Sequence, residues 1–168
     1  TPRQIEKIVV RDTATRALLE TAKGADLLVV GSRGRGGFGG LLLGSVSNQC
    51  VHHAPCTVSV VRETLDSSRR ARIVVGVDGS ACGHEALTWA IAEAAARQQP
   101  LVAVAAWSWL DQPGEFDPDF GATDITAMAD AAVARARHEV SGGADLDIEI
   151  RPVNDRPARA LVEASSDA

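Results

Sequence analysis

Residues 27–45 read LLVVGSRGRGGFGGLLLGS and decide the fold. The first four are strongly apolar and predict a buried strand at 27–30. Seven of the next fifteen residues, Gly31 to Ser45, are glycine. Glycine lets backbone amides approach a ligand without a Cβ, and a helix that begins near Ser45 offers unpaired N–H groups and a favourable dipole. The stretch therefore predicts a strand, a phosphate-binding turn and a helix; the alternative is a surface loop without function.

Strands and helices alternate along the rest of the chain. The other strands are expected at 5–10, 57–61, 73–77, 101–106 and 146–152. Helices are expected at 13–22 and 45–53, from Ser80, at 123–140 and at 157–165, with a loop at 111–121. The helix that Ser80 caps should bury an apolar face of Cys82, Ala86, Ala90, Ile91 and Ala94. This alternation implies an α/β fold with a parallel sheet that is covered on both faces.

A repeat divides the chain. Asp12-x-x-x-Arg16-Ala17-Leu18-x-Glu20 returns as Asp155-x-x-x-Arg159-Ala160-Leu161-x-Glu163, an offset of 143 residues, which is the length of one domain. The polar segment 63–72 has the composition of a linker. We expect 1–62 to be the C-terminal portion of a first domain and 73–168 to be the N-terminal portion of a second. The elements would then stand in permuted order, and they could close on themselves, exchange halves between two chains, or belong to a sequence that lacks segments.

Composition narrows the partners and the compartment. The net charge of −5 and the pI near 5.3 give no basic field for a nucleic acid, and no apolar run approaches the length of a membrane span. The three cysteines show no metal-binding spacing and indicate a reducing compartment, so the cytoplasm is expected.

Two known phosphate-binding motifs can be compared with the glycine loop. No lysine lies in or near it, so a Walker-type NTPase is not indicated. Gly34-x-Gly36-x-x-Gly39 matches the dinucleotide pattern, with Glu63 at a suitable distance. Gly39-Gly40 is a poor start for the helix which that pattern requires. An NAD-dependent enzyme therefore stays as an alternative.

A third pattern, Gly31-x2-Gly34-x9-Gly44-Ser45, resembles the nucleotide loop of the universal stress protein family. The segment 73–80, IVVGVDGS, is similar to the opening strand and turn of such a domain, and 53–58, HAPCTV, to the approach to its closing strand. The resemblance covers essentially the whole chain in two pieces. It implies a flavodoxin-like, Rossmann-like, doubly wound sheet of five parallel strands, and adenine-nucleotide binding.

The resemblance also implies roles for single residues. Gly31, Gly34, Gly44 and Ser45 would hold the phosphates of ATP, bound with or without Mg²⁺, and Ser32, Arg33, Arg35, Gly36 and Val46 would surround them. Gly76 and Asp78 would lie at the adenine and ribose, and Ala106 would meet the edge of the base. The phosphate residues and the base residues belong to different repeats, so a complete site requires closure or exchange of halves.

The remaining chemistry-bearing residues favour structural roles. His52 and His53 lack a third metal ligand, and Cys50, Cys56 and Cys82 are expected to pack as small apolar side chains. Trp107 and Trp109 would shield the base or cover the sheet edge. No motif places a catalytic set, so binding is expected, with slow ATP hydrolysis at most. The function expected is a stress-response regulator that acts through ATP binding and homodimer formation; a dimerisation module without a ligand is a further alternative.

Overall fold

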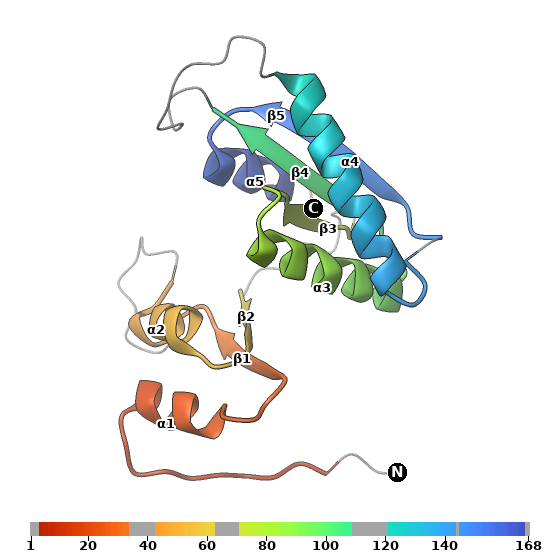
Figure 1. Cartoon of the computed structure of the whole chain (residues 1–168). Helices are drawn as coiled ribbons and strands as arrows, with labels where there is room; N and C mark the ends of the chain where they lie inside the picture. Colours follow the sequence, from red (N-terminus) through yellow and green to blue (C-terminus); the bar gives the residue numbers. More distant parts are fainter. Residues whose placement is uncertain (1–3, 34–42, 63–70, 109–120, 144, 167–168) are drawn as a thin grey trace. The chain divides into compact units, whose positions relative to one another are not determined.

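The computed structural model describes residues 4–33, 43–62, 71–108, 121–143 and 145–166 (Figure 1). The chain divides into two compact units, 1–67 and 68–168. Every strand pair is parallel, in a two-stranded sheet of order β1-β2 and a three-stranded sheet of order β3-β4-β5. The predicted α/β class with parallel strands is confirmed, and the five strands found in the described residues are divided between two sheets.

The second unit has a well-filled core around strand β4, Leu101–Trp107. This strand pairs with β3, Ile73–Gly76, on one side and with β5, Ile148–Asn154, on the other. Leu101, Ala103 and Ala105 face one cluster of buried side chains, whereas Val102 and Val104 face another. Since successive side chains of a strand point to opposite faces, β4 is buried on both, as a central parallel strand should be.

Three helices cover the two faces of this sheet. Helices α3, Ala81–Arg97, and α4, Ala122–Glu139, lie side by side on one face, and α5, Pro157–Ser166, packs on the other (Figure 1). Leu87, Ala90, Ile91 and Ala94 form the buried stripe of α3. The expected burial of Cys82 and Ala86 is wrong, since both are exposed: Cys82 lies on the opposite side of the helix from Ile91, and Ala86 lies at the margin of the buried stripe.

The first unit is a parallel β-α-β arrangement with a preceding helix. Helix α1, Ala14–Thr21, leads to strand β1, Leu27–Gly31; helix α2, Ser45–His53, then connects to strand β2, Thr57–Val61. Leu27 pairs with Thr57 and Gly31 with Val61. The bounds predicted for α2 and β2 are confirmed. The described residues that are buried in this unit are few: Ala22, Ser32, Ser47 and Cys50.

The strand expected at 5–10 is absent: residues 4–10 have no regular structure and are exposed, Val9 to 97%. A strand needs a neighbour for its N–H and C=O groups, and the two-stranded sheet pairs β1 only with β2. The expected loop at 111–121 lies outside the described residues except for Gly121. Among the described helices, none combines the length and the apolar character that a bilayer span requires.

Candidate functional site

The end of β1 and the start of α2 are tied together by the backbone. The Ser32 N–H donates to the Val61 carbonyl at 2.8 Å, which extends the pairing of β1 with β2 by one residue. The Gly44 N–H donates to the Ser32 carbonyl at 2.7 Å. Gly34, Arg35 and Gly36 of the predicted site lie outside the described residues. Gly31, Ser32, Arg33, Gly44, Ser45 and Val46 are therefore brought together at the carboxyl end of β1.

Ser47 fixes this junction from inside the fold. Its Oγ lies 3.0 Å from the Ser32 carbonyl oxygen and 3.0 Å from the Gly44 carbonyl oxygen, and it donates to them. Ser47 is 3% exposed and Ser32 8% exposed, so these contacts are shielded from water. Sequence reasoning missed Ser47. Its signal was a polar residue on the inner side of a helix, three positions before Cys50, which is buried.

The N-terminus of α2 has the properties of an anion site. Gly44 is its N-cap, without a side-chain hydrogen bond, and no acidic residue lies in the first turn. The first amides of a helix have no carbonyl partner within it, and the helix dipole favours negative charge there. A Cβ on Gly44 would lie 3.4 Å from the Ser32 oxygen, which is an ordinary van der Waals contact, so this position has room for a small side chain. The chemistry of this turn suits a phosphate.

In the second unit, Asp78 follows β3 and is held by the cap of α3. Its Oδ1 accepts from the Ser80 N–H at 3.0 Å and from Ser80 Oγ at 2.7 Å. Ser80 Oγ in turn accepts from the Gly83 N–H at 2.9 Å, which confirms Ser80 as the N-cap. The hydrogen bonds from Ser80 lower the pKa of Asp78 below its ordinary value. An ionised carboxylate with one oxygen engaged is thus fixed at the carboxyl end of the strand.

Gly76 and Ala106 lie on the face of the sheet that α5 covers. A Cβ on Gly76 would come within 3.3 Å of Leu161 Cδ1, so a larger residue there would require the Leu161 side chain of α5 to shift by a few tenths of an ångström. Ala106 is half-buried against the same cluster, beside its partner Val153 on β5. The structure therefore gives these two predicted site residues packing contacts with α5, and it leaves Asp78 as the exposed polar group at these strand ends.

A groove of about 520 Å³ adjoins Asp78, between the start of α3 and the middle of α4. Gly79, with φ of +74°, turns the chain there, and a Cβ would meet Met128 Sδ at 3.3 Å. His84 Nε2 lies 2.9 Å from Glu139 Oε2, and Arg135 Nε lies 3.5 Å from Glu139 Oε1. The hydrogen bond from His84 and the nearby positive charge of Arg135 lower the pKa of Glu139.

Of the two tryptophans that were expected near the base, Trp107 packs against the core on the face of the sheet that α3 and α4 cover, and Trp109 lies outside the described residues.

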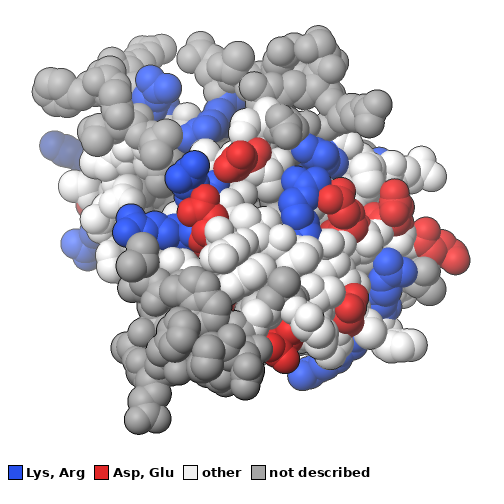
Figure 2. Space-filling view, turned by 90° about the horizontal axis from the view of Figure 1, so that it is seen from above, with Lys and Arg blue, Asp and Glu red and all other residues white. Residues whose placement is uncertain are grey.

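The described residues contain no group of three or more His, Cys, Asp or Glu side chains arranged for a metal ion. Cys50 is buried, as expected, Cys56 is half-buried and Cys82 is exposed. Acidic and basic side chains are interspersed on the face shown in Figure 2, consistent with the mixed charge of the sequence.

Comparisons with known proteins identify the family. The universal stress protein family model matches residues 2–62 and 70–168. Universal stress protein Rv2623 of Mycobacterium tuberculosis is 34% identical over 99% of this chain, and Mb2028c of Mycobacterium bovis is 33% identical over 98%. The chain spans only 57% and 56% of the lengths of these relatives.

One solved structure supports the fold. The crystal structure of a universal stress protein from Archaeoglobus fulgidus superposes with a TM-score of 0.61 and 18% sequence identity. The match covers 90% of this chain and 50% of the Archaeoglobus chain. A universal stress protein in complex with cAMP is 31% identical over 59% of this chain and 66% of its own, with a TM-score of 0.43. The likeness to the Archaeoglobus protein supports the flavodoxin-like fold, and the matches of the family model show that the chain belongs to the universal stress protein family.

Proposed function

We propose that this chain binds ATP and acts as a stress-response regulator through nucleotide binding and dimer formation. The observation that carries the proposal is the N-terminus of α2. There, a glycine N-cap without a side-chain hydrogen bond, a first turn without an acidic residue and a nine-residue helix follow the end of a parallel strand. Ligands of open parallel sheets bind beyond the carboxyl ends of strands, where such a helix can receive phosphate.

The phosphates would be held by Gly31, Ser32, Gly44, Ser45 and Val46, with Arg33 as the exposed cation at the same turn, and by Gly34, Arg35 and Gly36. Guanidinium groups pair well with phosphate oxygens. Mg²⁺, if bound, would come with the triphosphate, since it keeps several waters and binds through phosphate oxygens. None of these residues has a general base's chemistry, and the proposed role is binding rather than catalysis.

The base and ribose end of the site would come from Asp78, with Gly76 and Ala106 at the ends of β3 and β4. The ionised Asp78 keeps one carboxylate oxygen for a ribose or base donor, because the contacts with Ser80 use Oδ1. We retain the interpretation that 1–62 is the rear portion of one domain and 73–168 is the front portion of the next. The complete site then needs the two portions to be joined, within one cytoplasmic chain or between two chains of a homodimer.

A substitution at Gly44 tests the proposal without unfolding the helix. Gly44 has φ of −74° and ψ of 164°, which suits an N-cap aspartate, and aspartate caps a helix better than glycine does. Gly44→Asp should therefore keep the stability of the first unit. Its carboxylate would take the place of a phosphate, so ATP affinity should fall by at least about tenfold. Gly44→Ser is the matched neutral control and should lose less affinity.

The measurement is isothermal titration calorimetry with Mg²⁺-ATP, AMP and NAD, with light scattering of the same samples. The proposal expects ATP to bind more tightly than NAD and Gly44→Asp to be impaired. Equal ATP binding by Gly44→Asp and the unchanged chain would show that the phosphates lie elsewhere. Tighter binding of NAD would support the dinucleotide alternative, and a dimer that binds none of the three would support a dimerisation module.

A further inference from the structure

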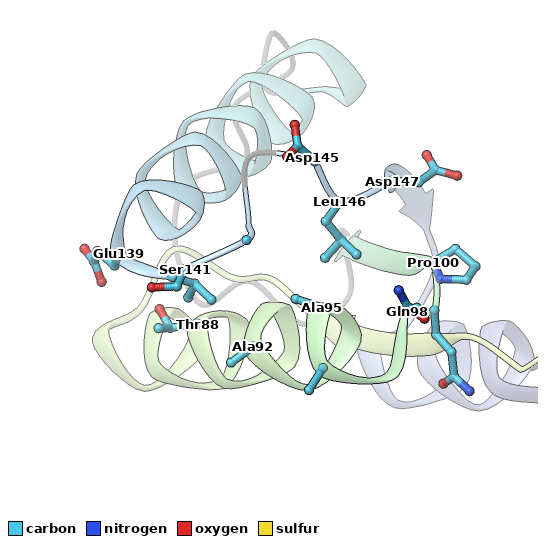
Figure 3. Close-up of a pocket in the computed structure, with 14 residues that line it drawn as sticks. Thr88, Ala92, Ala95, Gln98, Pro100, Glu139, Ser141, Asp145, Leu146 and Asp147 are labelled. Atoms are coloured by element: carbon cyan, nitrogen blue, oxygen red, sulfur yellow. The ribbon is translucent and has the colours of Figure 1, made fainter.

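A groove of about 1030 Å³ lies at the amino ends of the strands of the three-stranded sheet, whereas Asp78 lies beyond the carboxyl end of β3 (Figure 3). It runs between the C-terminal half of α3 and the loop that joins α4 to β5. Pro100 and Asp147, which line it, directly precede β4 and β5. Asp78 and Ala106 lie at or beyond the carboxyl ends of the parallel strands. The groove is therefore separate from the proposed nucleotide site.

Small and apolar side chains form its floor. Ala92 and Ala95 of α3 face the loop, and the Leu146 side chain points from the loop toward them (Figure 3). The apolar surface continues along α3, because Trp89 is three residues before Ala92 and is 48% exposed. An exposed tryptophan beside a small-residue groove is the kind of anchor around which protein interfaces concentrate their binding energy.

The lining of the groove carries an excess of acidic side chains. Three lining residues are acidic, Glu139, Asp145 and Asp147, and no basic residue is among the described residues that line the groove. Glu139 is already paired with His84 and Arg135, whereas Asp145 and Asp147 are exposed and have no ion-pair partner in the described part of the chain. Helices α3 and α4 both end at the groove, and the negative ends of their dipoles lie beside the basic residues of their last turns, Arg97 in α3 and Arg137 and His138 in α4.

Thr88 supplies a hydrogen-bonding group without a partner. Its Oγ1 is buried and makes no hydrogen bond with the described residues. Thr88 lies in the wall of the groove that α3 forms, below Ser141 in Figure 3. A buried hydroxyl without a partner is costly, and a ligand carbonyl or amide in the groove would satisfy it.

We propose that this groove binds a short amphipathic segment of a partner protein, with apolar side chains on the alanine floor and lysine or arginine at Asp145 and Asp147. Charge complementarity selects a basic occupant, and the apolar floor selects one with an apolar face. The volume is at the upper end of the range for small-molecule pockets, and the groove is open along its length, which suits several residues of peptide.

The probe is a fluorescein-labelled synthetic peptide of about 15 residues, long enough to form a helix, with leucines on one face and lysines on the other. Its control has glutamate in place of each lysine. Fluorescence anisotropy with the 168-residue chain should show saturable binding of the lysine peptide, weakened by added salt, and none of the glutamate peptide. Absence of saturable binding, or equal binding of both peptides, overturns the proposal.

Two matched pairs of substitutions locate the site. Asp145→Asn with Asp147→Asn should weaken binding about tenfold, because two exposed ion pairs are lost. Asp130→Asn with Glu163→Gln removes the same charge from exposed positions outside the groove and should change binding less than about twofold. If the two pairs of substitutions weaken binding equally, the peptide binds to the overall negative charge of the chain, and the proposed location in the groove is wrong.

A third variant separates a peptide from a second copy of the chain. Ala96 lines the groove on the exposed side of α3, and Ala96→Arg should abolish peptide binding by blocking the groove and repelling lysine. Circular dichroism checks that the variant is folded, and light scattering follows its mass. If the unchanged chain dimerises and Ala96→Arg is monomeric, the occupant is a second copy and the peptide proposal is wrong. Both results are independent of ATP binding.

Discussion

Helices α1 and α5 contain the two copies of the repeat and differ in what they pack against. Arg16 pairs with Asp12 at 3.4 Å and Arg159 pairs with Asp155 at 3.2 Å, so the local contacts are the same. In α5, Ala160 is 4% exposed on the three-stranded sheet. Its counterpart in α1, Ala17, is only half-buried, and the main packing partner of α1 is α2.

The difference shows that a sequence pattern sets a helix and its apolar face, while the neighbouring strands decide how much of that face is buried. The first unit has a two-stranded sheet whose Leu27 and Val29 are 45% and 56% exposed. An apolar run of this kind belongs in a strand that is covered on both faces. The first unit therefore has apolar surface available for further strands and helices, whereas the second has largely buried its own.

The largest effect should come from a charge placed at the equivalent alanines. Ala160→Asp would bury an unpaired carboxylate against Val102 and Val104, and it should cost the second unit about 3 kcal/mol or more. Ala17→Asp should cost the first unit less than about 1 kcal/mol, since that site is half-open. Urea unfolding followed by circular dichroism measures both. Equal losses would show that α1 packs on a sheet as α5 does.

The next effect should have the opposite sign. Thr88→Val keeps the shape of the side chain and removes a buried hydroxyl that has no partner, so the stability of the second unit should rise by about 1 kcal/mol. Thr21→Val, at an exposed position of α1, is the control and should change little. The same Thr88 variant should bind the lysine peptide more weakly. A loss of stability would mean that the hydroxyl has a partner in solution.

Local signals of the sequence predicted several elements well. Residues 45–53 and 57–61 form the helix and strand expected, and Ser80 caps α3, because caps, periodicity and β-branched runs act within a few residues. The start of α2 at Gly44-Ser45 could be predicted from the sequence equally well. These features depend little on what lies elsewhere in the chain.

Features that depend on residues far away in the sequence could not be predicted from the sequence. Residues 5–10 have the composition of a strand, yet no described strand pairs with them. Cys82 and Ala86 are apolar at helical spacing, but the sheet lies on the side of Leu87 and Ile91. Ser47 reaches Ser32, fifteen residues earlier in the chain, and Leu161 of α5 fills the space beside Gly76. Each depends on tertiary contact rather than on sequence pattern.

A smaller loss of stability is expected from replacing the aspartate that both copies of the repeat share, Asp12 before α1 and Asp155 before α5. Asp12 accepts from the Thr13 N–H and Asp155 from the Arg156 N–H, both at 2.7 Å, in addition to their ion pairs. Asp12→Ala and Asp155→Ala should each cost about 0.5 kcal/mol, because exposed pairs and helix-start contacts contribute little and do so locally. The free energies of unfolding of the two units should change equally. A much larger loss for Asp155→Ala would show that packing of α5 strengthens the contact.

The smallest expected effect is a change of stability with pH at the start of α3, which is capped differently from the start of α2. Gly44 offers no side chain, whereas Asp78 and Ser80 form a network whose hydrogen bonds lower the pKa of Asp78 from its ordinary value of 3.8. The folded pKa is below the unfolded one, so the contribution of Asp78 is complete above pH 3.8 and is lost as the pH falls through the folded pKa.

Because Asp78 is largely exposed, screening by water limits that contribution to a few tenths of a kcal/mol, about the size of a surface contact. The measurement is the free energy of unfolding of the second unit at intervals from pH 6 to about pH 3. Asp78→Asn should be slightly less stable than the unchanged chain at pH 6, and the gap should narrow on acidification. A gap that widens would mean that the neutral carboxyl is favoured, and that Asp78 does not present an ionised oxygen to a ribose.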